Sequence, residues 1–371
     1  MQKPYLLTLN QNQGYYWSKN EKEFLSALGN NAGNMVFGSA MQRVLKGGFP
    51  ANSMQIPSRK KFDSTGCDGI VIAAANWLQP RVDLGLQLQQ LKKLNTSVVI
   101  CGLGAQSIDN NIPELNENTV KYLKLISDSS NYISVRGNFT AEVLANYGIH
   151  NVIVTGCPSL LWHVDHPAAI QNKPIILHDN KISMNATIPA KDFSRKILDK
   201  RMILAKHMVK NCIEQETDLV VQTELPMMRF KNGNQVKKDL EYLSPLFHPY
   251  TIEDSQKWAT KHVKYFGSVS DWIAYCANKS FVLGTRLHGV ITSLLAGTPS
   301  MLVTHDQRTM EMSRKASIPN ISSEEILSMT TYDFAELRQR IDIEAFNHRQ
   351  KLYFSDFKDF FRLNDVPTSL A

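Results

Sequence analysis

Short apolar runs alternate with longer amphipathic stretches from one end of the chain to the other. The runs are too short for helices and rich in Val and Ile, which is typical of strands buried on both faces of a parallel sheet. We expect strands in the first half at Tyr5–Leu9, Gly69–Ala75, Ser97–Leu103, Tyr132–Val135 and Asn151–Thr155. In the second half we expect them at Pro174–Leu177, Asp218–Thr223, Val263–Phe266, Ser280–Leu283 and Ser300–Thr304.

Helical patterns separate these runs. Leu recurs at helical spacing over Asp83–Leu94, and Asp192–Cys212 is long and amphipathic. Ser270–Lys279 begins with a capping Ser and an acidic first turn. Strands that alternate with helices along the chain predict an α/β fold with mostly parallel sheets covered by helices on both faces.

The apolar periodicity is lost over residues 162–173, which contain His, Pro and Asn. A chain of 371 residues is long enough for two domains. We therefore expect two Rossmann-like, doubly wound domains that face a cleft in a GT-B-like arrangement, over residues 1–165 and 166–330. An aromatic helical segment, residues 331–371, is expected to pack at their junction. Ligands in such sheets bind at the carboxyl ends of the strands.

Composition and charge narrow the class of partner. With 43% hydrophobic and 20% charged residues, the chain has the composition of a globular protein. Its net charge of +7 is dispersed and forms no basic stripe with interleaved aromatics, which disfavours nucleic-acid binding. A positive balance suits phosphorylated donors, lipid-pyrophosphate acceptors or an anionic membrane surface, although it is equally consistent with solubility alone.

The five cysteines lie far apart, without the paired spacing of a zinc site or a disulfide framework. The sequence therefore predicts no metal site. The first residues lack the apolar core of a signal peptide, and no apolar stretch is long enough to span a bilayer. We expect a cytoplasmic protein with at most peripheral contact at the inner membrane face.

The segment Phe281–Asp306 carries the densest candidate chemistry. It predicts a strand, a tight turn, a helix capped by Thr285 and ended by Gly297, and a further strand. Arg286 and His288 then fall in the first helical turn, where free N–H groups and the helix dipole favour an anion. A guanidinium binds carboxylate or phosphate bidentately, and an imidazole transfers protons near neutral pH.

Gly289, in the same turn, lacks a Cβ, so a ligand is expected to approach the backbone closely. A purely structural interpretation stays open, with Arg286 bonded to a neighbouring carbonyl and His288 satisfied in the core. Arg308 follows the next strand and is a candidate phosphate ligand, or else the partner of Glu311 in a charged turn. Glu224 ends another strand and is a weaker candidate base.

Candidate acceptor-binding residues lie in the first half. Asn76 and Gln106 follow predicted strands, where their amides are expected to face the cleft. Asn31, Gly33 and Asn34 precede an apolar helix and are candidates for the same face, although helix capping explains them equally well.

Four of these segments, in order, resemble the polysaccharide pyruvyl transferase family. Thr285-Arg286-Leu287-His288-Gly289, followed by Gly297-Thr298-Pro299, is similar to the family's C-terminal motif. Residues 101–107 resemble its Gly-x-Gly-x-Gln turn, and residues 133–137, with Arg136, resemble its Ser-x-Arg element. Residues 31–34 resemble its Asn-x-Gly-Asp start, with Asn34 in place of the acid.

The resemblance implies transfer of pyruvate from phosphoenolpyruvate to two hydroxyls of one sugar, as a cyclic ketal, in the synthesis of capsule or exopolysaccharide. It implies that Arg136 and Arg286 hold the donor anions beside the Leu287 backbone, and that His288 binds the donor and moves a proton. No cofactor is implied, and the acceptor is a free or lipid-linked sugar. Two alternatives stay open: a glycosyltransferase that uses a nucleotide sugar, and a non-catalytic component of a polysaccharide assembly complex.

Overall fold

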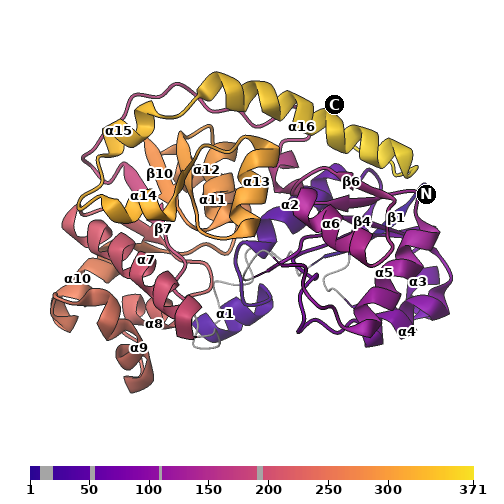
Figure 1. The fold of residues 1–371 in the computed structure, drawn as a ribbon, viewed down its shortest axis with the longest axis horizontal. Coiled ribbons are helices and arrows are strands. Elements are labelled where there is room, and N and C mark those ends of the chain that lie inside the picture. Colours follow the sequence, from indigo (N-terminus) through magenta and orange to yellow (C-terminus); the bar gives the residue numbers. More distant parts are fainter. Residues whose placement is uncertain (9–19, 51–54, 108–110, 190–194) are drawn as a thin grey trace.

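The computed structural model describes residues 1–8, 20–50, 55–107, 111–189 and 195–371. Two parallel sheets, each covered by helices, make up the two ends of the molecule (Figure 1). The predicted α/β fold with two Rossmann-like, GT-B-like halves is confirmed, whereas division of the chain at residue 165 stays a prediction.

The first sheet is formed by four parallel strands, in the order β2-β1-β3-β4. A single bridge between Leu103 and Val135 joins β4 to the parallel pair β5-β6, so the order continues across six strands. The strands are β1 (Pro4–Leu7), β2 (Phe49–Pro50), β3 (Gly69–Ala73), β4 (Ser97–Cys101), β5 (Ile133–Val135) and β6 (Val152–Val154). Leu9, at the end of the first predicted strand, lies outside the described residues.

The second sheet has the order β12-β11-β10-β7-β8-β9. Counted from β7, this is the 3-2-1-4-5-6 order of a dinucleotide-binding sheet, in which the strand order reverses between the parallel strands β7 and β10. Ligands bind such sheets at this switch point, outside the carboxyl ends of the strands. The strands are β7 (Ile182–Asn185), β8 (Asp218–Val220), β9 (Val263–Lys264), β10 (Phe281–Gly284), β11 (Ser300–Thr304) and β12 (Asn320–Ser322).

The strand predicted at Pro174–Leu177 is wrong, because the first strand of this sheet is β7. Leu177 is 57% exposed, and the chain turns at Asp179 and Asn180, both with positive φ, before β7 begins. All four residues of β7 are buried although two of them are polar, so apolar periodicity alone does not reveal this strand. The short edge strands β2 and β12 were also not predicted.

Helices surround both sheets. Those of the first half are α1 (Glu21–Ala27), α2 (Asn34–Val44), α3 (Arg59–Asp63), α4 (Gly85–Leu94), α5 (Glu117–Ser129) and α6 (Asn138–Asn146). The second half contributes α7 (Arg195–Glu214), α8 (Leu225–Asn232), α9 (Lys237–Phe247), α10 (Ile252–His262), α11 (Val269–Ala277), α12 (Leu287–Leu295), α13 (Gln307–Ala316), α14 (Ser323–Ser328) and α15 (Phe334–Gln339). The first residues of the helix predicted from Asp192 lie outside the described part, and α11 is capped by Ser268 instead of Ser270.

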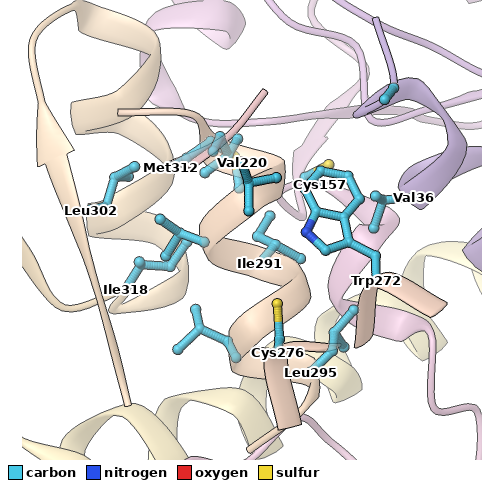
Figure 2. Close-up of a cluster of buried hydrophobic side chains, with 14 of the residues drawn as sticks. Val36, Cys157, Val220, Trp272, Cys276, Ile291, Leu295, Leu302, Met312 and Ile318 are labelled. Atoms are coloured by element: carbon cyan, nitrogen blue, oxygen red, sulfur yellow. The ribbon is translucent and has the colours of Figure 1, made fainter. Parts of the chain in front are cut away.

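One apolar core runs across the junction of the halves. Val36 on α2 and Cys157, both from the first half of the sequence, lie beside Trp272 on α11 and Ile291 on α12 (Figure 2). These four side chains are no more than 1% exposed. Helix α2 therefore packs on the second half as well as on its own sheet.

The long helix α16 (Ile343–Leu363) lies along both halves (Figure 1). Its aromatic side chains are buried, and the hydroxyl of Tyr353 donates to the Cys157 carbonyl at 2.8 Å. Beyond the helix, the Ser369 N–H donates to the Val44 carbonyl at 2.7 Å. The Gln350 amide in turn donates to the Ala316 carbonyl of α13 at 2.7 Å. The C-terminal segment thus contacts residues of both halves that are far away in sequence.

Candidate functional site

A cavity of about 530 Å³ opens at the carboxyl edge of the second sheet. Its walls are the segments that follow β7, β8, β10 and β11, which is where the switch point of the sheet places a ligand. The first half contributes Asn30 and Gln106. The charged side chains in the lining are Arg201, Lys238, Arg286 and Arg308, together with Glu224, Asp239 and Asp306.

Arg286 is the N-cap residue of α12, in place of the predicted Thr285. Its backbone N–H donates to Oδ1 of Asn185, the last residue of β7, at 2.8 Å. Its guanidinium donates to Glu224 Oε1 and to Thr223 Oγ1, both of which follow β8. The predicted anion-binding arginine therefore faces the cavity from the switch point, held by residues at the ends of β7 and β8.

Glu224 is a buried partner of this arginine and does not suit the role of a base. Burial by itself raises its pKa, but the Arg286 charge and the N–H groups of Thr223 and Gln222 together hold the pKa below its ordinary value. Its carboxylate accepts from these N–H groups at 2.9 and 2.8 Å. Glu224 thus stays ionised and orients the guanidinium.

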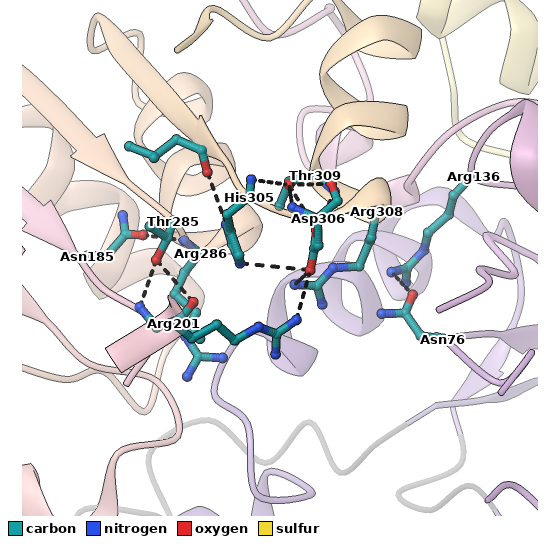
Figure 3. Close-up of polar contacts among 12 residues, drawn as sticks. Asn76, Arg136, Asn185, Arg201, Thr285, Arg286, His305, Asp306, Arg308 and Thr309 are labelled. Carbon is teal, nitrogen blue, oxygen red and sulfur yellow. Dashed lines mark hydrogen bonds and ion pairs between the residues drawn. The ribbon is translucent and has the colours of Figure 1, made fainter. Parts of the chain in front are cut away.

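Arg201 and Arg308 converge on Asp306 (Figure 3). Their guanidinium nitrogens lie 3.7 and 3.6 Å from Asp306 Oδ2, while Oδ1 accepts from the Thr309 N–H at 2.8 Å and caps α13. Burial raises the pKa of Asp306, but the Arg308 charge and these contacts outweigh it and hold the pKa well below its usual range. Arg201 was not predicted, because nothing in the amphipathic pattern of α7 sets it apart from its neighbours.

The alternative pair of Arg308 with Glu311 is wrong. Glu311 instead accepts from the backbone N–H of Thr140 at 2.9 Å and from its hydroxyl at 3.2 Å, across the junction of the halves. This leaves Arg308 with Asp306 at the cavity.

His288 lies two residues after Arg286, in the first turn of α12, but does not line the cavity. Its ring lies 5.8 Å from that of Phe37, and Nε2 is 3.6 Å from Cys157 Sγ. Burial, together with the charges of Arg136 and Arg308, lowers its pKa to about 3. The imidazole is therefore neutral at physiological pH. A Cβ added to Gly33 would lie 2.8 Å from Nδ1, so α2 begins directly against this ring.

Arg136 is 3% exposed and already bonded to several acceptors. It donates to the carbonyls of Gly102 at 2.8 Å and Ala74 at 3.2 Å, and to Asn76 Oδ1 at 2.9 Å. Asn76 and Arg136 therefore hold each other at the carboxyl edge of the first sheet (Figure 3).

Leu287 is buried, and the space beside Gly289 is filled by side chains of the protein. A Cβ on Gly289 would lie 2.7 Å from Asn185 Nδ2 and 2.9 Å from Gln222 Nε2. Those two amides, not open space, lie against the glycine.

The predicted acceptor residues separate into two groups. Gln106 lines the cavity from the first half. Asn31 Oδ1 accepts from the Gly33 N–H at 2.9 Å, and Asn34 Nδ2 donates to the Leu28 carbonyl at 3.1 Å, so both amides bond locally around the start of α2.

Within the described ranges, no three His, Cys, Asp or Glu side chains come together as a metal-binding group. In the same part of the chain, no helix has both the length and the apolar character needed to cross a bilayer.

Among solved structures, the chain is similar to HepE from Anabaena in complex with UDP and glucose, at 11% identity and a TM-score of 0.48, over 98% of this chain and 97% of that chain. It is also similar to MnaA from S. aureus with UDP, at 12% identity and a TM-score of 0.46, over 100% and 93% of the two chains. Likenesses this low carry no argument about chemistry. No curated protein matches the sequence.

The family comparison is decisive. The sequence model of the polysaccharide pyruvyl transferase family matches residues 31–307, a span that includes the first turn of α2, the turn after β4, Arg136 and the Arg286–Gly289 turn. Because this match covers most of the chain, the protein belongs to the polysaccharide pyruvyl transferase family and is a transferase.

Proposed function

We propose that the cavity binds phosphoenolpyruvate and that the protein transfers its pyruvate to two hydroxyls of one sugar. One observation carries this assignment: three arginines from three different segments, Arg201, Arg286 and Arg308, line one cavity at the switch point of the second sheet. Phosphoenolpyruvate carries a carboxylate and a phosphate, and guanidinium groups bind both bidentately.

Two of these arginines have an unpaired donor. The Nε atoms of Arg286 and Arg308 are buried and have no hydrogen-bond partner within the described residues. Buried N–H groups in folded proteins are nearly always bonded, so these two donors support an anion bound close to the arginines. Glu224 and Asp306 fix the orientation of the guanidinium groups before the ligand arrives, which lowers the entropic cost of binding.

The reaction needs no oxidant, reductant or cofactor. One sugar hydroxyl adds to C2 of the donor while the methylene carbon takes up a proton. A second hydroxyl of the same sugar then displaces inorganic phosphate and closes the ketal ring. Gln106, which lines the cavity from the first half, is the proposed acceptor contact.

His288, the proton-transfer residue that the resemblance implies, does not line the cavity. Burial and two nearby arginines keep its pKa at about 3, so its imidazole is neutral and cannot donate a proton at neutral pH. Its proposed role is therefore to pack as a neutral ring behind the donor site. The product is proposed to belong to a surface polysaccharide, with a free or lipid-linked acceptor.

The test is incubation with phosphoenolpyruvate and a panel of p-nitrophenyl hexosides, followed by phosphate release and by mass spectrometry for the pyruvate ketal. UDP-glucose replaces the donor in a parallel arm. Transfer from UDP-glucose with no ketal from phosphoenolpyruvate would show that the protein is a glycosyltransferase instead.

The matching variant carries Arg286→Gln and Glu224→Gln together, since removing the arginine alone leaves a buried carboxylate unpaired. We expect ketal formation to fall by about 100-fold or more, as when a charge-stabilising donor is lost from an active site. Arg340→Gln with Glu325→Gln removes an arginine–glutamate pair that does not line the cavity and serves as the control. Equal activity of the two double variants would contradict the role of Arg286.

A further inference from the structure

A buried carboxylate joins the two halves beside the cavity. Glu311, on α13 of the second half, is 7% exposed. Its Oε1 accepts from the Thr140 N–H at 2.9 Å and its Oε2 from the Thr140 hydroxyl at 3.2 Å, in the first turn of α6. A negative charge at a helix N-terminus is stabilised by the free N–H groups there, so α6 and α13 attract each other through this residue.

Gly137, the N-cap residue of α6, leaves room for this contact. A Cβ at this position would lie 1.8 Å from Glu311 Cγ and 2.3 Å from Cδ. The φ of Gly137 is −174°, an extended conformation open to any residue. The glycine is therefore required by the approach of the glutamate and not by the backbone.

The same contact reaches both walls of the cavity. The Thr140 hydroxyl accepts from the Ala105 N–H at 3.1 Å, and Ala105 precedes Gln106, the first-half residue proposed to face the acceptor. On the other side, Glu311 lies one helical turn after Arg308 on α13. A chain of hydrogen bonds thus connects the acceptor-side turn to the helix that carries a donor-side arginine.

We propose that Glu311 is a positioning residue, which through Thr140 sets the placement of the turn at Ala105–Gln106 relative to the arginines of the second half. A sugar hydroxyl held by the first half then meets a donor held by the second. The identity of the two substrates rests on the proposed function, but the linkage between the halves does not. Misplacement of reacting groups by 1 Å costs about 100-fold in rate. A contact that fixes the relative position of the two cavity walls therefore affects the rate of the reaction.

A purely structural role predicts a different result. Burial raises the pKa of Glu311, although Thr140 and Arg136 act in the opposite direction, so the ionised carboxylate is costly to the folded protein. Replacement by the neutral amide in Glu311→Gln removes that cost. We therefore expect its Tm to stay close to that of the unaltered protein, whereas a residue kept only for stability would lower it.

The experiment compares Glu311→Ala and Thr140→Val with the unaltered protein. Amide hydrogen exchange should quicken by about ten-fold or more at Thr140 in Glu311→Ala and at Ala105 in Thr140→Val, because each variant removes the acceptor of that N–H. The Kd of phosphoenolpyruvate, measured by calorimetry, should change by less than about two-fold, since the three arginines are untouched. With the p-nitrophenyl hexoside that is turned over, the acceptor KM should rise about five-fold or more and the donor KM should not.

Two further variants complete the design. Thr140→Ser keeps the hydroxyl, so its amide exchange and its acceptor KM should both equal those of the unaltered protein. Asp333→Ala removes a carboxylate that caps α15 by accepting from the Glu336 N–H at 2.9 Å. Asp333 does not line the cavity, so this control should change neither the amide exchange nor the acceptor KM.

Unchanged exchange in Glu311→Ala and Thr140→Val, or an equal rise of donor and acceptor KM, would overturn the positioning role. Exchange and calorimetry require no turnover. Absence of any ketal from the unaltered protein would therefore count against the proposed function and leave the result for Glu311 intact.

Discussion

A single imidazole, His288, is held neutral by its surroundings. Its ring packs against Phe37 and lies near Cys157, while Arg136 and Arg308 add positive charge. Burial and the two arginine charges disfavour the protonated form, and together they lower the pKa to about 3.

This environment predicts how stability depends on pH. The ordinary pKa of histidine is about 6.5, so between pH 6.5 and 3 the unfolded chain takes up a proton that the folded chain refuses. The contribution of His288 to the free energy of unfolding is therefore fully present above pH 6.5. It is lost as the pH falls below 6.5, by up to about 1.4 kcal/mol per pH unit. We expect the difference in free energy of unfolding between the unaltered protein and His288→Asn to shrink as the pH falls, as measured by urea unfolding at pH 7.5, 5.5 and 4.5. His150→Asn on the surface is the control, and a pH-independent difference for His288→Asn would refute the argument.

At the scale of elements, the start of α12 is completed by a neighbouring strand. The helix has no cap from its own sequence, since the Thr285 hydroxyl bonds to Thr187 instead. Asn185, at the end of β7, accepts from the Arg286 N–H and fills the space over Gly284 and Gly289. The turn that is proposed to bind the donor therefore depends on an amide about 100 residues earlier in the chain.

We expect Asn185→Ala to lower the free energy of unfolding by about 1 kcal/mol, the usual loss for a helix cap. Because the amide also orients the Arg286 backbone, phosphoenolpyruvate should bind more weakly, as measured by calorimetry. Ser322→Ala removes the cap of α14, which accepts from the Glu325 N–H at 3.1 Å outside the cavity. This control should lose similar stability and no affinity. Equal affinities in both variants would contradict the link between the cap and the site.

At the scale of the whole molecule, the two sheets are not independent bodies. One apolar core contains residues of α2, α11 and α12, and α16 contacts both halves. Folding units that share a core unfold together, because exposing one part removes the buried surface of the other.

Differential scanning calorimetry should therefore show one transition. Tyr353→Phe removes the hydrogen bond between α16 and Cys157. Tyr147→Phe removes two hydrogen bonds at 2.9 Å within the first half, one donated to the Pro113 carbonyl and one accepted from the Leu115 N–H. Each should cost about 1 kcal/mol and lower the same single Tm. Two resolved transitions, with Tyr147→Phe moving only one of them, would show that the halves unfold separately.

The sequence by itself determined the features that depend on neighbouring residues. The alternation of apolar runs with amphipathic stretches predicted parallel sheets covered by helices. Gly297, with φ of +70°, ends α12 as predicted. The position of Arg286 after a buried strand placed it at a ligand-binding edge, and Gln106 reaches the cavity for the same reason. Such patterns follow from backbone geometry, which is local.

Only the tertiary structure decided which side chains meet. Arg201 joins the cavity from a helix whose pattern marks no residue as special, and Glu311 pairs with Thr140 instead of Arg308. Strand β7 was missed because its polar residues are buried by partners distant in sequence, such as Tyr275 bonded to Ser183. Hydrogen bonds and ion pairs between distant residues require no linear spacing. Their partners are therefore fixed by packing and not by any periodicity along the chain.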